Sequence, residues 1–152
     1  MRVVSIDEER RYLMAASQPL QDFATVMVDT GMRPEEVARI ERRNVDLGQG
    51  YVFIPFGKTK AAKRKIPLTR RVSELLDKRL REAKCEFLFA TDATHSPLTT
   101  LKTAHAGALR RGKLAHFRLY DLRHTFATRF IESGGDIVTL QALLGHSNIQ
   151  MV

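Results

Sequence analysis

Residues 120 to 147 read YDLRHTFATRFIESGGDIVTLQALLGHS. The first half of this stretch predicts a helix, because apolar residues recur at steps of three and four from position 119 onward. The residues of this apolar face, which we expect to lie in the core, are Leu119, Leu122, Phe126 and Phe130. Tyr120, Arg123 and Ala127 fall together on a different face, so the helix presents one charged side chain away from its apolar stripe.

A pair of glycines separates this helix from a second one. Gly134 and Gly135 end the first helix, and Asp136 is a suitable cap for the next. The second helix has an expected core face of Ile137, Leu140 and Leu144. Gly145 ends it, which leaves His146 immediately beyond a helix terminus with its imidazole clear of the packed helix.

The first forty residues predict three helices. Ser5 and Glu8 have the spacing of a capping box, which starts a helix running to about residue 16. A second helix is expected from about residue 19 to residue 30. Pro34 suits the first turn of a third helix that runs to residue 40, and this leaves Arg33 at a turn where free backbone amides favour an anion.

The middle of the chain predicts a small sheet. Segments 44 to 47, 51 to 56 and 63 to 68 alternate with glycine-bearing turns, as in a three-stranded antiparallel meander. Thr69 can cap a helix to about residue 83, and a weaker helical pattern ends near residue 113. We therefore expect an α+β fold that is mostly helical, with all of residues 1 to 152 in one domain.

Composition restricts the class of protein. A chain of 152 residues with 43% hydrophobic content is long enough to bury a core. Its single cysteine, Cys85, excludes an internal disulfide. The longest apolar run, residues 51 to 56, is far too short to span a membrane, and the amino terminus lacks the apolar stretch of a signal peptide. We expect a cytoplasmic protein without a membrane partner.

The charge indicates a polyanionic partner. The net charge is +8 and the pI is about 10.1. Basic side chains cluster most densely between positions 58 and 65, which suits closely spaced phosphates better than a diffuse surface charge would. The members of this cluster are Lys58, Lys60, Lys63, Arg64 and Lys65. Double-stranded DNA is the partner that we expect.

The quoted stretch, together with TGMRPEEV at residues 30 to 37, resembles the catalytic domain of the tyrosine recombinases, the phage integrase family. The resemblance covers the whole chain and implies that family's mostly helical catalytic fold. It also implies site-specific DNA recombination, in which strands are cleaved and rejoined through a 3′-phosphotyrosine link. The family needs no metal or nucleotide cofactor for this chemistry, and its members associate with one another on DNA.

The resemblance implies a set of site residues. Arg33 and Arg123 match the two family arginines that bind the scissile phosphate, a task that suits a planar, permanently charged fork. Lys58 matches the lysine that protonates the 5′-oxygen leaving group, with Lys60 as its rival in the same loop. His146 matches a histidine that donates to a phosphate oxygen. Two residues have supporting roles: His124 as a hydrogen-bonding neighbour, and Glu36 as a group that orients Arg33 or an adjacent base.

Tyr120 departs from the family pattern. Most members have a histidine three residues before the second arginine, where it is a candidate base for the nucleophile. A phenol, with an ordinary pKa near 10, is a poorer base at neutral pH but can still donate a hydrogen bond to phosphate. We therefore keep Tyr120 in the site without assigning the base.

The family nucleophile is a tyrosine that lies roughly nine residues beyond the histidine of the GHS motif. The sequence ends at Val152, six residues past His146. We therefore expect the nucleophile to be absent from this chain, together with the amino-terminal DNA-clamping domain of the family. As given, the chain is expected to be inactive.

Other classes fit less well. A non-catalytic DNA-binding module and a strand transferase like the type IB topoisomerases remain as alternatives. A helix-turn-helix regulator is compatible with the two helices around Gly134, but both helices have strong core faces. A metal site on His116 and His124 would need a third ligand, and the two histidines lie eight residues apart rather than four.

Overall fold

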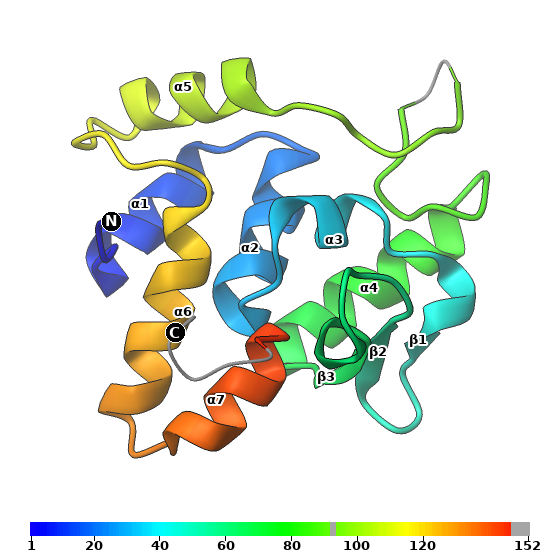
Figure 1. The fold of residues 1–152 in the computed structure, drawn as a ribbon. Helices are drawn as coiled ribbons and strands as arrows, with labels where there is room; N and C mark the ends of the chain where they lie inside the picture. The colour runs from blue at the N-terminus through cyan, green and yellow to red at the C-terminus, as the bar shows by residue number, and fades with distance from the viewer. Residues whose placement is uncertain (92–93, 147–152) are drawn as a thin grey trace.

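The computed structural model describes residues 1 to 91 and 94 to 146. Within these residues the chain forms mostly helices with one small sheet (Figure 1). The helices are α1 Ile6–Ala15, α2 Leu20–Thr30, α3 Pro34–Ala38, α4 Arg70–Glu82, α5 Lys102–Arg111, α6 Asp121–Glu132 and α7 Ile137–Leu144. The α+β class predicted from the sequence is confirmed.

The helix ends follow the predicted caps. The Ser5 hydroxyl accepts from the Glu8 amide at 3.1 Å and the Glu8 carboxylate accepts from the Ser5 amide at 3.0 Å, so α1 begins with a complete capping box. Gly31 ends α2 in the left-handed conformation, with a φ of 73°. Asp136 accepts from the Thr139 amide at 2.7 Å at the start of α7, and Gly145 ends that helix with a φ of 76°.

The sheet is a three-stranded antiparallel meander in the order β1, β2, β3. Its strands are β1 Val45–Asp46, β2 Tyr51–Ile54 and β3 Arg64–Pro67, each shorter than predicted. Val52 and Ile66 are paired neighbours whose side chains point into the core, whereas Lys65 and Tyr51 face outward. A short 3₁₀ turn, Lys60–Ala62, lies between β2 and β3.

Helix α2 forms the centre of the domain. It contacts α1, α3, α4 and α6, and almost every one of its residues is buried. Figure 1 shows α1 and α6 on one side of α2, with α4 and the sheet on the other side. Helix α7 packs against α6 and β3. Gly145, at the end of α7, lines a cavity together with the basic loop that joins β2 to β3.

Two expected core faces are only partly buried. On α6, Leu122 is fully buried, but Leu119, Phe126 and Phe130 are half-buried. On α7, Leu140 and Leu144 are buried, whereas Ile137 is 38% exposed. Ile137 is the first residue of its helix, next to the turn that joins α6 to α7. The prediction for Ile137 is therefore wrong.

Helix α3 is shorter than predicted. It ends at Ala38, and Ile40 instead accepts from the Leu88 amide at 3.1 Å. The adjacent Glu41 forms an antiparallel bridge with Phe87. The segment after α4 thus returns to pair with the chain that leaves α3. No helix in the described part of the chain has the length and apolar character needed to cross a membrane.

Candidate active site

Arg33 lies at the amino-terminal cap of α3. Its amide donates to the Glu36 carboxylate at 2.9 Å, which satisfies one of the free amides at the helix start. Its guanidinium makes only a loose contact with the same carboxylate, 3.5 Å from Nη1 to Oε2. The Arg33 side chain is half-buried and keeps donors available for another acceptor.

Arg123 lies in the first turns of α6 and is buried, with 4% of its surface exposed. Its Nη1 donates to the Gly31 carbonyl at 2.7 Å and its Nη2 donates to the Leu144 carbonyl at 2.8 Å. Both carbonyls lie at helix carboxyl ends, where oxygens lack partners within the helix and carry partial negative charge. Arg123 therefore joins the end of α2 to the end of α7.

His146 meets Arg123 just beyond α7. Arg123 Nη2 lies 3.2 Å from His146 Nε2. A guanidinium only donates, so Nε2 accepts and the ring proton is on Nδ1. Nδ1 is buried and has no hydrogen-bond partner among the described residues. Burial, followed by the charges of Arg123, Arg33 and Arg64, lowers the pKa of His146 to about 4, so the imidazole is neutral at physiological pH.

The cluster is strongly electropositive. Burial, followed by the nearby charge of Arg33, lowers the pKa of Arg123 to about 10. Arg123 is still protonated at neutral pH. A cation whose pKa is lowered by burial and by a neighbouring positive charge is stabilised by an incoming anion. The geometry is therefore suited to bind a phosphate-like group.

Arg64 requires a correction. The sequence predicted it as one of the exposed DNA-contacting residues, but its side chain is 7% exposed and its fork is paired with Glu36. Nη1 donates to Glu36 Oε2 at 2.8 Å and Nη2 donates to Glu36 Oε1 at 3.0 Å. The cause is strand alternation: in β3, Arg64 and Ile66 point inward while Lys65 points outward. The Arg64 guanidinium is thus turned away from solvent.

Glu36 is paired chiefly with Arg64. Burial would raise the pKa of Glu36, but hydrogen bonds and charge from Arg64, with a further contribution from Arg33, hold it below the ordinary value. Its carboxylate is thus ionised, and both of its oxygens already accept hydrogen bonds. The expectation that Glu36 orients Arg33 remains consistent with the bond to the Arg33 amide, whereas the guanidinium contact is weak.

Lys58 shares a cavity with Arg33. A cavity of about 490 Å³ is lined by Arg33, Glu35, Glu36, Arg39, Phe56, Gly57, Lys58, Thr59, Ala62 and Gly145. Lys58 is exposed and lies in the loop after β2, whereas its rival Lys60 belongs to the following 3₁₀ turn and does not line the cavity. Lys60, Lys63 and Lys65 are all exposed, as a DNA-contacting role requires.

Tyr120 and His124 flank Arg123 in the sequence and do not join the hydrogen bonds of the cluster. Tyr120 caps α6 and is 40% exposed, and His124 is half-buried one residue after Arg123. Neither side chain bonds another described residue, so their assigned roles remain predictions.

Asp121 accepts from the Arg118 amide at 2.8 Å and the Arg2 amide at 3.3 Å. Among described residues, no three metal-ligating side chains come together.

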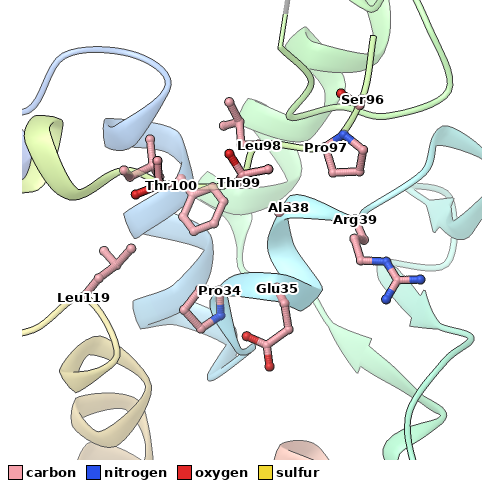
Figure 2. Close-up of a pocket in the computed structure, with 12 residues that line it drawn as sticks. Pro34, Glu35, Ala38, Arg39, Ser96, Pro97, Leu98, Thr99, Thr100 and Leu119 are labelled. Atoms are coloured by element: carbon pink, nitrogen blue, oxygen red, sulfur yellow. The ribbon is translucent and has the colours of Figure 1, made fainter. Parts of the chain in front are cut away.

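A second cavity lies across α3 from the first. It measures about 530 Å³ and lies between α3 and the segment from Ser96 to Leu101. Figure 2 shows Pro34 and Ala38 on one wall and Pro97 and Leu98 on the other. Glu35 and Arg39 line both cavities, so α3 is the partition between them.

Sequence reasoning missed the backbone partners of Arg123 and the inward direction of Arg64. The carbonyls of Gly31 and Leu144 have no side-chain signature, because every residue carries the same group. For Arg64 a signal existed, since residues 64 to 67 alternate within a strand and Ile66 already had to face inward. The density of lysines around Arg64 obscured that alternation.

Comparison with known proteins shows the family of the chain. The model of the phage integrase family matches residues 4 to 152. The chain belongs to the phage integrase family. It is 35% identical over 144 residues to the integrase of Escherichia phage P2, covering 94% of this chain and 39% of that protein. It is 32% identical over 158 residues to the tyrosine recombinase XerC of Yersinia pestis, covering 96% of this chain and 52% of XerC.

Solved structures share the fold. The crystal structure of XerA recombinase superposes with a TM-score of 0.83 at 25% identity, covering 99% of this chain and 57% of that one. The Tn1549 transposon integrase, solved with transposon right end DNA, has a TM-score of 0.86 at 20% identity, covering 99% of this chain and 59% of that one. This phage integrase family chain therefore spans roughly half the length of its relatives.

Proposed function

We propose that this chain is the catalytic domain of a DNA recombinase that cleaves and rejoins strands through a 3′-phosphotyrosine link. One observation carries the proposal: Arg33, Arg123 and a neutral His146 form a cation-rich site, which a bound anion would stabilise. The Tn1549 transposon integrase, which has the same fold, was solved bound to its transposon end DNA. On that basis we propose that this chain also binds DNA. We further propose that it acts in the cytoplasm.

Each site residue has a task in this proposal. Arg33 and Arg123 neutralise the two non-bridging oxygens of the scissile phosphate, whose negative charge grows in the transition state. The neutral His146 has one N–H, on Nδ1, because Nε2 accepts from Arg123; this N–H is buried in the free chain and donates to a phosphate oxygen once the ring turns toward it. Lys58 protonates the departing 5′-oxygen from its flexible loop. Tyr120 and His124 add hydrogen bonds at the edge of the phosphate site.

The nucleophile in this proposal is a tyrosine beyond Val152. The three tyrosines of the chain are unsuited to that task. Tyr12 is fully buried and its hydroxyl is bonded to His105 Nδ1 at 2.7 Å. Tyr51 lies on β2 beneath Lys65. Tyr120 shares α6 with Arg123 and stands beside the phosphate rather than in line with the bond to be broken.

Assembly on DNA is part of the same proposal. The lambda integrase, which shares the fold, was solved as a dimer bound to a core site. Recombination exchanges strands between sites, so it needs at least two active centres close together. We therefore propose that copies of the longer protein associate on double-stranded DNA, with the exposed lysines of the β2 to β3 loop contacting its phosphates.

A nicked suicide substrate tests the proposal. Cleavage at the scissile phosphate releases a short fragment, so the covalent protein–DNA adduct persists and is seen on a denaturing gel. The 152-residue chain is expected to give no adduct, and a chain extended through the next encoded tyrosine is expected to give one. The extended chain with that tyrosine changed to phenylalanine is the matched control.

Each outcome is decisive. An adduct from the unextended chain would show that its nucleophile lies within residues 1 to 152. Binding of the duplex by the extended chain without any adduct would reject catalysis and favour a DNA-binding module. Relaxation of supercoiled DNA without exchange between two sites would favour a strand transferase of the type IB topoisomerase kind.

A further inference from the structure

The Arg64 side chain bonds four acceptors on three separate segments. Besides the two Glu36 oxygens, its Nε donates to the Leu143 carbonyl at 2.7 Å and its Nη1 donates to the Ala62 carbonyl at 2.6 Å. The side chain is 7% exposed, so water does not replace these bonds. A single buried fork thus ties β3 to α3, to α7 and to its own preceding loop.

These acceptors adjoin the site residues. Glu36 also accepts from the Arg33 amide, so Arg64 holds the turn that presents Arg33. Leu143 is three residues before His146, at the end of α7 where Arg123 takes the next carbonyl. Ala62 lies in the same loop between β2 and β3 as Lys58. Arg64 therefore touches the supports of three functional side chains without lying in the phosphate position itself.

Gly145 shows how closely this fork is fitted. A Cβ at Gly145 would lie 2.8 Å from Arg64 Nη1 and 2.9 Å from its Cζ. Its φ of +76° also disfavours any residue with a side chain. The backbone immediately before His146 is thus in van der Waals contact with the Arg64 guanidinium, and a shift of one displaces the other.

We propose that Arg64 is a positioning residue, which fixes the relative geometry of Arg33, Lys58 and His146 through Glu36, Ala62 and Leu143. This inference rests on the proposed function, because it concerns the same phosphate site. Only arginine serves this purpose: a lysine ammonium has no planar fork, and from one nitrogen it cannot reach a bidentate carboxylate and a carbonyl on the opposite side. The alternative is a buried ion pair that merely stabilises the fold.

The test is the ring tautomer of His146, read from nitrogen-15 shifts in the 152-residue chain labelled at histidine. In the unmodified chain, donation from Arg123 keeps the proton on Nδ1. In Arg64→Lys the end of α7 is released, and the Nδ1–H population is expected to fall at least about twofold. A fold-stabilising pair alone would lower the urea midpoint and leave the tautomer of the folded chain unchanged.

Matched variants make the result interpretable. Arg79 is a half-buried arginine of α4 that is paired with Asp22 at 2.9 Å and bonds none of the site residues, so Arg79→Lys should reduce stability without altering His146. Glu36→Gln weakens the hydrogen bonds of the Arg64 guanidinium by changing their acceptor. Its amide oxygen can still accept from the Arg33 amide. It should change the tautomer in the same direction as Arg64→Lys, and it decides the matter if Arg64→Lys does not fold.

The outcomes separate this inference from the proposed function. An unchanged tautomer in folded Arg64→Lys, or in Glu36→Gln when Arg64→Lys is unfolded, would overturn the positioning role and leave the recombinase proposal intact. Duplex binding by the same samples tests the function independently. A failure of the unmodified chain to bind duplex DNA at low salt would count against the function, whereas the tautomer of the free chain needs no DNA.

Discussion

Arg123 Nη2 lies 3.2 Å from His146 Nε2, so an arginine and a histidine that stand 23 residues apart share one hydrogen bond. The bond forces the imidazole to be neutral and to carry its proton on Nδ1. A neutral donor beside two guanidiniums avoids a third positive charge in a partly desolvated space. The proposed phosphate site therefore has two cations, on Arg33 and Arg123, and a dipole on His146.

We predict that acid weakens the fold through His146. The folded-state pKa of about 4 lies below the ordinary 6.5, so the unfolded chain takes up the proton first as the pH falls. The contribution of the neutral His146 to the free energy of unfolding is complete above pH 6.5 and is lost progressively toward pH 4. Urea midpoints at pH 7 and about pH 5 should differ more for the unmodified chain than for His146→Gln. Equal differences would contradict the lowered pKa.

We predict that the two site arginines differ in their effect on stability. Arg123→Ala leaves the buried carbonyls of Gly31 and Leu144 without their donor and should destabilise the chain by about 2 kcal/mol. Arg33→Ala should change stability by less than about 1 kcal/mol, because its guanidinium makes one loose contact. Urea unfolding measures both. The sequence placed Arg123 on a helix face away from the apolar stripe, whereas the structure buries it.

In an extended, cleavage-competent chain both replacements should nevertheless abolish most adduct formation. The reason is that each removes a charge from the transition-state oxygens, an effect of about 100-fold or more in rate. The yields of covalent adduct are compared under conditions in which the Arg123→Ala chain is still folded. Near-normal adduct formation by either variant would reject the role assigned to that arginine.

We predict that duplex DNA binding depends steeply on salt and that the lysines after β2 contribute to it. The double change Lys60→Gln with Lys63→Gln should reduce the slope of log affinity against log salt by about 2, because two phosphate contacts are lost. Lys78→Gln with Lys84→Gln removes two exposed lysines of or near α4 and is the matched control. Equal slopes for the two double variants would argue against a loop-directed DNA contact.

We predict a second acid-sensitive site, formed by Tyr12, His105 and Phe117. Tyr12 donates to His105 Nδ1 at 2.7 Å, and His105 Nε2 lies 2.6 Å from the Phe117 carbonyl, so both ring nitrogens are engaged by a neutral imidazole. Burial lowers the pKa of His105, with a smaller contribution from His116, so this stability is present above about pH 6.5 and declines below it.

Tyr12→Phe should then destabilise the chain by about 1 to 2 kcal/mol, because the half-buried His105 Nδ1 loses its donor. Tyr51→Phe is the control, since the Tyr51 ring lies half-buried on the sheet beneath Lys65. Thermal or urea unfolding compares the two. If Tyr12→Phe is as stable as Tyr51→Phe, then the triad of Tyr12, His105 and Phe117 does not support the fold.

The sequence by itself determined the elements and the family. Caps at Ser5, Thr69 and Asp136 start helices where the predictions place them, and Gly31 and Gly145 end helices because they accept a positive φ at no steric penalty. These are local effects between residues a few positions apart. Local chemistry also located the meander and the turn that carries Arg33.

Tertiary structure alone decided which groups meet. Arg64 is a basic residue among lysines in the sequence, and its burial against Glu36 follows from the inward face of β3 and the packing of α3. Arg123 finds the carbonyls of Gly31 and Leu144 only when α2, α6 and α7 converge. Backbone oxygens and long-range charges leave no pattern in the order of residues, so the neutrality of His146 becomes visible only in the folded chain.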